Sequence, residues 1–336
     1  MDSTLRQPGL VVAARTPMKK IAVIGESLVE IMADQPGHGF LTPLALTGPY
    51  PSGAPAIFAA QAARLGQPVA LISTAGRDDF GTLQIARLAA DGVDTTAIAV
   101  HPDLPTGTAF VRYRPDGSRD FVFNIRHSAS GATTLDAAAL TILAATDHLH
   151  VMGTALFSPA LLQANLTAID IVRARGGTVS FDPNLRREIL DAPGMRAALT
   201  RIVTLCDLYL PSGPELTLLT TAQTEAPALA ELLTLGPRAI VLKRGAGGAT
   251  YHDPTLTLHH PAFAVTEVDP TGAGDCFGAA FVTFWLRGLP PAQCLSLACA
   301  AGALAVTQRG PMQGAGTLAE VEALAATPPR IAKSNS

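Results

Sequence analysis

The residues best suited to chemistry lie in the segment Val268–Phe277, where a glycine-rich turn leads into an apolar stretch with helical character. Gly272, Ala273 and Gly274 leave backbone N–H groups uncovered, and a helix that begins at Asp275 adds partial positive charge at its N-terminus. These groups suit a phosphate. Asp275 would stand beside that anion and accept a proton from an attacking hydroxyl, although we expect the helix N-terminus to depress its pKa. Taken alone, the motif fits an ordinary helix start with Asp275 as its N-cap better than a phosphate site.

Other nucleotide and metal motifs can be excluded. A Walker A loop needs glycine, lysine and then serine or threonine, and none of the four lysines follows a glycine. The segment Gly245–Thr250 approaches a dinucleotide fingerprint but does not continue as a helix. No His-Glu-x-x-His motif occurs, and the pairs His148/His150 and His259/His260 fit core or surface strand positions better than metal ligands.

The elements that must position these residues alternate between short apolar strands and helices, which predicts βαβ units and a mainly parallel sheet. At about residues 106–126 the chain becomes rich in Phe, Val and Tyr around a hairpin sequence, Pro115–Ser118. We predict that this stretch and residues of about 29–47 form a small β-sheet lid. The predicted strands are Ile21–Gly25, Val69–Thr74, Ala97–Val100, His148–Met152, Thr178–Asp182, Leu208–Pro211 and Ala239–Lys243, and the predicted helices are Gly53–Gly66, Phe80–Ala90, Asp275–Arg287 and Ala292–Arg309.

Composition limits the class of protein. The 336 residues are 48% hydrophobic and 15% charged, with a net charge of −3 and no basic cluster, so we expect a large core and no nucleic-acid partner. No apolar run reaches the length of a membrane helix. The four cysteines form no C-x-x-C pair and are expected to be buried reduced thiols in a cytoplasmic protein. Residues 1–17 lack a signal-peptide pattern and are expected to be a disordered extension, followed by one domain over 18–330 and a tail of 331–336.

Six segments in order resemble the motifs of the PfkB (ribokinase-like) family of carbohydrate kinases. The resemblance runs from about Lys19 to Ala325 and implies a three-layer α/β/α fold with a mainly parallel central sheet and a β-sheet lid. It also implies transfer of the γ-phosphoryl group of ATP to a sugar hydroxyl. The matching segments are Asp269–Asp275, Ser52–Gly66, Gly76–Gly81, Phe181–Arg186, Leu210–Glu215 and Val241–Gly248.

The resemblance implies roles for individual residues. Asp275 matches the catalytic base, and Gly272, Ala273 and Gly274 match the anion hole for the transferring phosphoryl group. Glu215 matches an acid that helps to hold Mg²⁺ through water. The residues expected at the nucleotide are Lys243, Gly245, Gly248, Ser212, Ala298 and Gly302, although Ala298 and Gly302 equally fit close helix packing. Those expected at a monovalent cation such as potassium, bound by some members of the family, are Asp269, Thr271, Ala305 and Gly310.

The acceptor side departs from the family pattern. Ile57 replaces an asparagine that binds the sugar, Ser52 replaces a glycine, Glu30 stands where many members carry an aspartate, and Ser212 replaces an asparagine near the metal. Because isoleucine can neither donate nor accept a hydrogen bond, that sugar contact is lost or moved. The residues expected around the acceptor are Glu30, Gly53, Ala54, Ile57, Arg126, Arg186 and Asp275, with the two arginines as candidates for a substrate carboxylate.

Several functional interpretations stay open. Gly-Ala-Pro-Ala is similar to fructokinases, whereas Gly25-Glu26-Ser27 and Leu210-Pro-Ser are similar to 2-keto-3-deoxygluconate kinases. We therefore expect a ketose or a sugar acid, phosphorylated at its primary hydroxyl. The alternatives are a 2-keto-3-deoxygluconate kinase specifically, a phosphofructokinase-type enzyme, and a non-catalytic sugar-binding regulatory protein. The resemblance further implies a homodimer formed through the lid.

Overall fold

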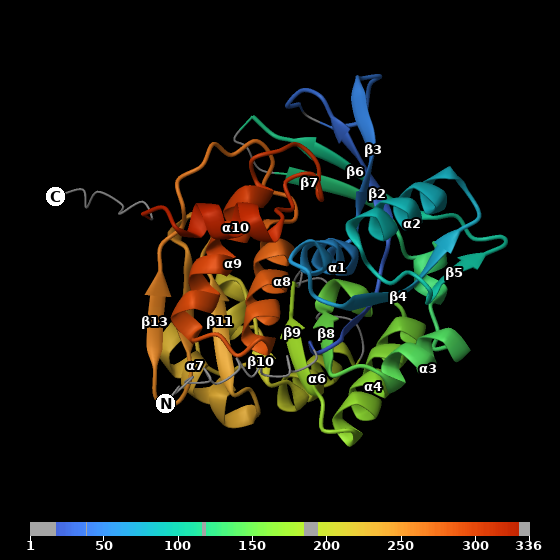
Figure 1. The fold of residues 1–336 in the computed structure, drawn as a ribbon. Coiled ribbons are helices and arrows are strands. Elements are labelled where there is room, and N and C mark those ends of the chain that lie inside the picture. Colours follow the sequence, from blue (N-terminus) through green and yellow to red (C-terminus); the bar gives the residue numbers. More distant parts are fainter. Residues whose placement is uncertain (1–17, 38, 116–118, 185–193, 329–336) are drawn as a thin grey trace, which may run out of the picture.

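The computed structural model describes residues 18–37, 39–115, 119–184 and 194–328. A mainly parallel sheet runs through the body, and within these residues it has nine strands in the order β13-β12-β11-β10-β9-β8-β1-β4-β5. Only β12 runs against the other strands, so its pairings with β11 and with the edge strand β13 are antiparallel (Figure 1). The strands are β1 Ile21–Ile24, β4 Val69–Gly76, β5 Ile98–His101, β8 His148–Met152, β9 Thr178–Asp182, β10 Leu208–Tyr209, β11 Ala239–Lys243, β12 Ala249–His252 and β13 Thr257–His260.

Helices cover both faces of this sheet and form the two outer layers (Figure 1). Alternation along β1 shows why two cores exist: Ile21 and Val23 join one apolar cluster, and Ala22 and Ile24 join the other. On the first side lie α1 Ala54–Arg64, α2 Asp79–Asp91, α8 Ala273–Leu286, α9 Pro291–Ala305 and α10 Leu318–Ala325. On the second lie α3 Ala137–Ala144, α4 Pro159–Ala174, α6 Met195–Leu205 and α7 Glu225–Leu235. The three-layer prediction is confirmed.

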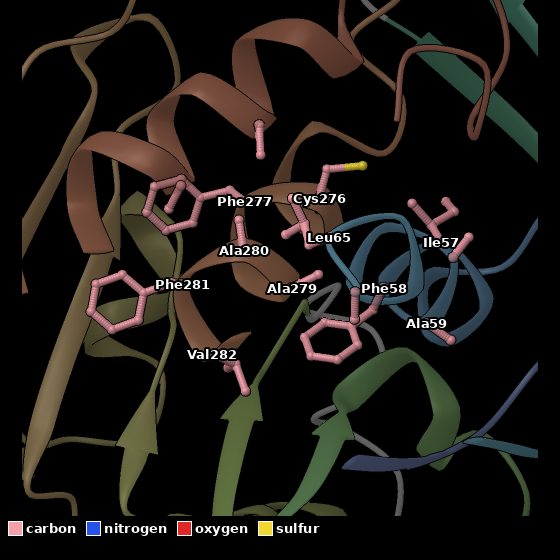
Figure 2. Close-up of a cluster of buried hydrophobic side chains, with 14 of the residues drawn as sticks. Ile57, Phe58, Ala59, Leu65, Cys276, Phe277, Ala279, Ala280, Phe281 and Val282 are labelled. Atoms are coloured by element: carbon pink, nitrogen blue, oxygen red, sulfur yellow. The ribbon is translucent and has the colours of Figure 1, made fainter. Parts of the chain in front are cut away.

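Helix α8 is buried along almost its whole length, which explains its continuous apolar sequence. Figure 2 shows it beside α1, with Phe58 of α1 close to Ala279. The two helices are in van der Waals range at Gly278, where an added Cβ would lie 3.9 Å from the Phe58 ring. Because α8 cannot move without disturbing this core, its first turn is held rigidly at the end of the sheet.

A second, four-stranded sheet has the order β3-β2-β6-β7 and projects from the body beside α2 (Figure 1). Its strands are β2 Leu28–Ala33, β3 Leu46–Ser52, β6 Gly107–Tyr113 and β7 Arg119–Asn124. β2 and β6 pair in parallel, and the outer pairs are antiparallel. This sheet is the predicted lid, but β3 lies later than expected and ends at Ser52, so it leads almost directly into α1.

The predicted boundaries hold best where strands are buried. β8, β9 and β11 occupy the predicted residues, whereas β10 is only Leu208–Tyr209 and α9 ends at Ala305 rather than Arg309. All four cysteines are buried and free, as expected. Throughout the described ranges, no helix is long and apolar enough to cross a bilayer. The extension 1–17 and the tail 331–336 lie outside the described residues.

Candidate active site

The glycine-rich turn and Asp275 stand at the N-terminus of α8. The helix begins at Ala273 rather than Asp275, so Gly272 is the N-cap and Asp275 is the third helical residue. Gly272 has a φ of +81°, and a Cβ there would lie 2.4 Å from the Pro311 carbonyl oxygen and 3.3 Å from Cγ2 of Ile57. Only glycine fits this position. The prediction that Asp275 opens the helix is wrong, because the left-handed Gly272 starts it two residues earlier.

This turn can hold an anion. The N–H groups of the first helical turn have no acceptor inside the helix and carry the positive end of its dipole. The ammonium of Lys243, at the end of β11, adds a full charge: Nζ lies 3.7 Å from the position that a Cβ on Gly274 would take. A phosphoryl oxygen placed against the turn would therefore meet backbone donors and a lysine together.

Lys243 is paired with Asp182, the last residue of β9. The carboxylate is completely buried, and the lysine side chain is only 11% exposed. Burial alone lowers the pKa of Lys243, but the carboxylates of Asp182 and Glu215 raise it above its ordinary value, so the lysine stays charged. The second oxygen of Asp182, Oδ1, is buried without a hydrogen-bond partner among the described residues.

Asp275 is a stronger base than its helical position suggests. Burial, followed by the negative charge of Asp182, raises its pKa to about 8, while Lys243 opposes the shift. The expected depression by the helix dipole is therefore wrong, because desolvation outweighs it at a site that is 8% exposed. Asn184 orients the carboxyl group by donating from Nδ2 to Oδ1 at 3.3 Å. Asn184 itself has a φ of +37°, the only described non-glycine residue with positive φ.

On the lid side, Glu30 and Ser52 form a buried pair. The Ser52 hydroxyl donates to Oε1 of Glu30 at 2.6 Å, and Oε2 is buried with no hydrogen-bond partner in the described ranges. Burial raises the pKa of Glu30 to about 7. The two residues that replace the family's aspartate and glycine are thus in direct contact. One carboxylate oxygen is fixed, and the other is a buried acceptor without a donor in the described ranges.

The start of α1 forms the floor between lid and body. Gly53 has a φ of +106°. Its backbone packs so closely on Glu26 that a Cβ added to Gly53 would lie 2.6 Å from the Glu26 carbonyl oxygen. Glu26 is buried, its side chain interacts with the Ala54 backbone, and burial raises its pKa. Ile57, one turn further along, is 2% exposed and abuts Gly272. Ile57 thus packs against the anion turn, and Glu30 lies close enough to Asp275 for its charge to help raise the Asp275 pKa.

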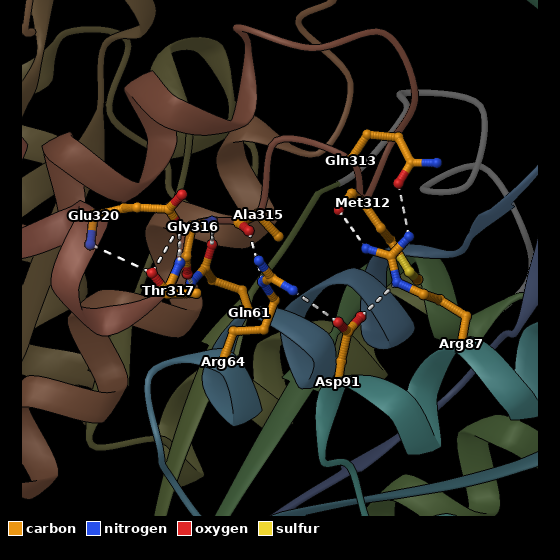
Figure 3. A network of polar contacts seen from close by, with 10 residues as sticks. All are labelled: Gln61, Arg64, Arg87, Asp91, Met312, Gln313, Ala315, Gly316, Thr317 and Glu320. Carbon is orange, nitrogen blue, oxygen red and sulfur yellow. Dashed lines mark hydrogen bonds and ion pairs between the residues drawn. The ribbon is translucent and has the colours of Figure 1, made fainter.

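The loop behind the turn is fixed by polar contacts from α1 and α2 (Figure 3). Arg64 donates to the Ala315 carbonyl at 2.7 Å, and Arg87 donates to the Met312 carbonyl at 2.7 Å. Both guanidinium groups also pair with Asp91. This network holds residues 312–316, and with them the neighbouring Pro311 carbonyl that packs on Gly272.

Three of the residues predicted at a monovalent cation are linked through the carboxylate of Asp269. Asp269 is fully buried, and its Oδ1 accepts from the Thr271 N–H at 3.0 Å and the Thr271 hydroxyl at 2.7 Å. Its Oδ2 accepts from the Gly310 N–H at 2.9 Å. The Ala305 carbonyl oxygen lies 2.4 Å from where a Cβ of Gly314 would be. These contacts fix Asp269, Thr271 and Gly310 relative to one another.

A magnesium ion has candidate ligands near the anion turn. Across the described ranges no group of three or more metal-ligating side chains gathers, and Mg²⁺ ordinarily uses one or two carboxylates together with water and substrate phosphates. The buried Oδ1 of Asp182 is a suitable oxygen at the anion turn. Glu215 lies close enough to Lys243 to affect its pKa, and its Oε2 accepts from the Ser212 N–H at 2.6 Å. Asp182 and Glu215 are therefore the residues that would hold the ion.

The other predicted nucleotide residues lie beyond the turn. Gly245 faces open space with a φ of +55°, whereas Gly248 is required structurally because a Cβ would lie 2.0 Å from the His260 carbonyl oxygen. Ala298 is completely buried. Gly302 allows α9 to pack closely on the start of α8, since a Cβ added to Gly302 would lie 3.2 Å from the Ala273 carbonyl oxygen.

The two candidate arginines do not gain support from the structure. Arg126 follows β7 and is exposed, and Arg186 lies outside the described residues.

Sequence reasoning missed four contributors, Asp182, Asn184, Ser52 as a partner of Glu30, and Arg119. Asp182 carried a usable signal, since a carboxylate at the carboxyl end of a buried parallel strand lies at the ligand-binding edge of such sheets. Arg119 of β7 carried none. It donates from Nη1 to the Thr271 hydroxyl at 2.6 Å, across 152 residues of sequence.

Comparison with known proteins gives this geometry a family. The sequence profile of the pfkB family carbohydrate kinases matches residues 18–317. The fructokinase of Klebsiella pneumoniae is 32% identical over 301 residues, which cover 87% of this chain and 95% of that protein. A protein named ribokinase II from E. coli, solved with ATP and Mg²⁺, has a TM-score of 0.88 at 47% identity, over 91% of this chain and 99% of that one.

A fructokinase double mutant from Vibrio cholerae, solved with fructose, ADP and a potassium ion, has a TM-score of 0.79 at 28% identity, over 92% of this chain and 99% of that one. The profile match spans most of the chain, and it includes the glycine-rich turn and Asp275 at the start of α8. The chain therefore belongs to the pfkB family of carbohydrate kinases and is a phosphotransferase that acts on a sugar.

Proposed function

We propose that this kinase transfers the γ-phosphoryl group of ATP to a primary hydroxyl of a ketose or sugar acid, with Asp275 as general base and Gly272–Gly274 as anion hole. The observation that carries the proposal is the position of the buried Asp275 carboxylate, in the same first turn of α8 as the uncovered N–H groups. Its pKa is about 8, and Lys243 lies close enough to act on it. A base with such a pKa suits proton removal near neutral pH.

In this proposal each residue has one task. Asp275 accepts the proton of the sugar hydroxyl as the oxygen attacks phosphorus, and Asn184 keeps its carboxyl group in place. The N–H groups at Gly272–Gly274 and the Lys243 ammonium stabilise negative charge on the transferring group. Mg²⁺, when bound, would neutralise phosphate charge; Asp182 and Glu215 are the residues that would hold it.

The acceptor lies between the lid and the body. Glu30 offers its second carboxylate oxygen to a sugar hydroxyl. Ile57 stands where a hydrogen-bonding residue is usual in the family, but it is 2% exposed and packs against Gly272. A lid over this region excludes water and so limits wasteful ATP hydrolysis. The lid also remains the predicted surface of a homodimer.

The test is ADP release with Mg-ATP across a panel of acceptors. The panel contains fructose, tagatose, ribose, 2-keto-3-deoxygluconate, fructose 6-phosphate and adenosine, and Asp275→Asn is the control. We expect turnover on a ketose or a sugar acid and its loss in the control. Turnover on fructose 6-phosphate alone would instead support the phosphofructokinase type.

The same panel separates the remaining interpretations. Selective turnover on 2-keto-3-deoxygluconate would assign that kinase specifically. Tight binding of ATP without turnover on any acceptor would favour a non-catalytic sugar-binding protein and contradict the proposal. The intact pairing of Asp182 with Lys243 beside Asp275 favours catalysis, because a sensor has no need of a base with a raised pKa.

A further inference from the structure

The ammonium of Lys243 stands between two groups that could bind it. It is paired with the carboxylate of Asp182, and it lies 3.7 Å from the position that a Cβ on Gly274 would take in the anion turn. Lys243 ends β11 and Asp182 ends β9, so both lie at the carboxyl edge of the sheet, where ligands bind in such folds. A phosphoryl group at the turn and the Asp182 carboxylate therefore draw on the same ammonium.

The Asp182 carboxylate is closed off from solvent on every side that the structure describes. The residue is completely buried, and its Oδ1 has no hydrogen-bond partner among the described residues. Behind it lies α8, where a Cβ added to Gly278 would be 3.7 Å from Oδ2. Because α8 is fixed in the core and a lysine stem is flexible, Lys243 is the neighbour that can move away from the carboxylate.

Electrostatics oppose two cations on this one carboxylate. A divalent ion on Oδ1 would stand beside the ammonium on Oδ2, and like charges repel strongly where water is excluded. One cation, however, is needed. Burial and then neighbouring carboxylates raise the pKa of Asp275, and Lys243 opposes that rise. Those carboxylates are Asp182, Glu26 and Glu30. Lys243 thus supplies positive charge to a site with a surplus of acids.

We propose that Lys243 and a divalent cation compete for the Asp182 carboxylate, so that the chain takes up Mg²⁺ only together with a nucleotide. Phosphates at Gly272–Gly274 offer the ammonium a second anion, and its move toward them leaves the carboxylate to the metal. The inference rests on the proposed function, which places those phosphates at the turn. Lys243 would then prevent occupation of the metal site before the nucleotide arrives.

The experiment follows the melting temperature of the full chain as magnesium chloride is raised at constant ionic strength, without nucleotide. We expect the wild-type melting temperature to change by less than about 1 °C. Lys243→Met leaves Asp182 without its cation, so Mg²⁺ should bind there and raise the melting temperature by about 3 °C or more, with saturation. An equal saturable rise in the wild type, or no rise in the variant, would overturn the proposal.

Further variants separate competition from a general effect of magnesium. Lys243→Arg keeps the positive charge and should respond like the wild type, whereas Asp182→Asn/Lys243→Met lacks the carboxylate and should not respond at all. The matched control is Arg173→Met/Arg238→Met, which strips the buried Asp207 of the two arginines that pair with it in the structure. Asp207 directly precedes β10, at the opposite edge of the sheet. If this control responds to Mg²⁺ as strongly as Lys243→Met, the proposal fails.

A second measurement uses the wild-type chain alone, so it does not depend on the folding of a variant. Mn²⁺ is the probe, and electron paramagnetic resonance reports the free ion. The chain alone should leave the Mn²⁺ signal unchanged, whereas the chain with ADP should reduce it further than ADP does by itself. Binding of Mn²⁺ to the chain without nucleotide would overturn the proposal. Neither measurement needs an acceptor, so absence of turnover across the acceptor panel would contradict the proposed function while competition at Asp182 is still decided.

Discussion

The two sides of the active site are built in different ways. On the phosphoryl side, Gly272, Asp275 and Lys243 are fixed by backbone geometry, by a fully buried helix and by a buried ion pair. On the acceptor side, Glu30, Ser52 and Ile57 come from the lid and from α1 and differ from the family pattern. A substitution on the phosphoryl side would disturb the core. On the acceptor side, Ser52 and Glu30 replace a glycine and an aspartate of the family pattern and contact each other, so this side can accommodate paired substitutions. Under the proposed function, the first side carries out the reaction and the second selects the substrate.

The largest effect should come from Asp275→Asn. An amide cannot accept the hydroxyl proton, so we expect kcat to fall about 10³-fold or more while ATP binding persists. Steady-state ADP release and calorimetric titration with ATP measure the two quantities. A variant that retains a tenth or more of wild-type turnover would show that the phosphoryl side is not organised around this carboxylate.

Lys243→Met should affect both stability and turnover. It leaves the fully buried Asp182 without its cation, for which we expect a loss of about 3–5 kcal/mol in the free energy of unfolding. Urea denaturation measures that loss. The double variant Asp182→Asn/Lys243→Met removes the buried charge and should recover part of the stability but none of the activity. Equal stability of the single and double variants would contradict the buried pair.

The pH dependence tests the environment of Asp275. Because the pKa is raised to about 8, kcat/KM should rise with pH up to about 8 and then level off. The folded chain also holds a proton that the unfolded chain releases between about pH 4 and 8, so the contribution of Asp275 to stability should decrease as pH rises through that window. Asp275→Asn should flatten that part of the stability profile. A kcat/KM profile that is level from pH 6 to 9 would disprove the raised pKa.

The smallest effect should come from Ser52→Ala on the acceptor side. Loss of the 2.6 Å hydrogen bond frees the Glu30 carboxylate, and we expect KM for the sugar to rise about two- to tenfold with little change in kcat. Ser158→Ala, which removes the cap of α4 on the opposite layer, is the control for a loss of stability alone. If both variants change KM equally, the Ser52–Glu30 pair is not a specificity element.

Local patterns allowed much of the fold to be predicted. β8, β9 and β11 were placed correctly because buried parallel strands are short apolar runs with clear ends. The start of α8 is predicted two residues too late, because its N-cap is Gly272 in a left-handed conformation. The reason for glycine there is the Pro311 carbonyl packed against it, which is distant in sequence. β3 was misplaced because its sequence, Leu46–Ser52, contains two prolines and a glycine and does not resemble a strand.

The sequence by itself determined the family, the alternation of strands and helices, and the residues of the anion turn, because each depends on neighbours within a few positions. Only the tertiary structure decided how those residues behave. The raised pKa of Asp275 comes from burial, the charge of Lys243 from Asp182 across 61 residues, and the link between lid and turn from Arg119 across 152. Desolvation and long-range pairing depend on which surfaces meet in space, and no local pattern records that.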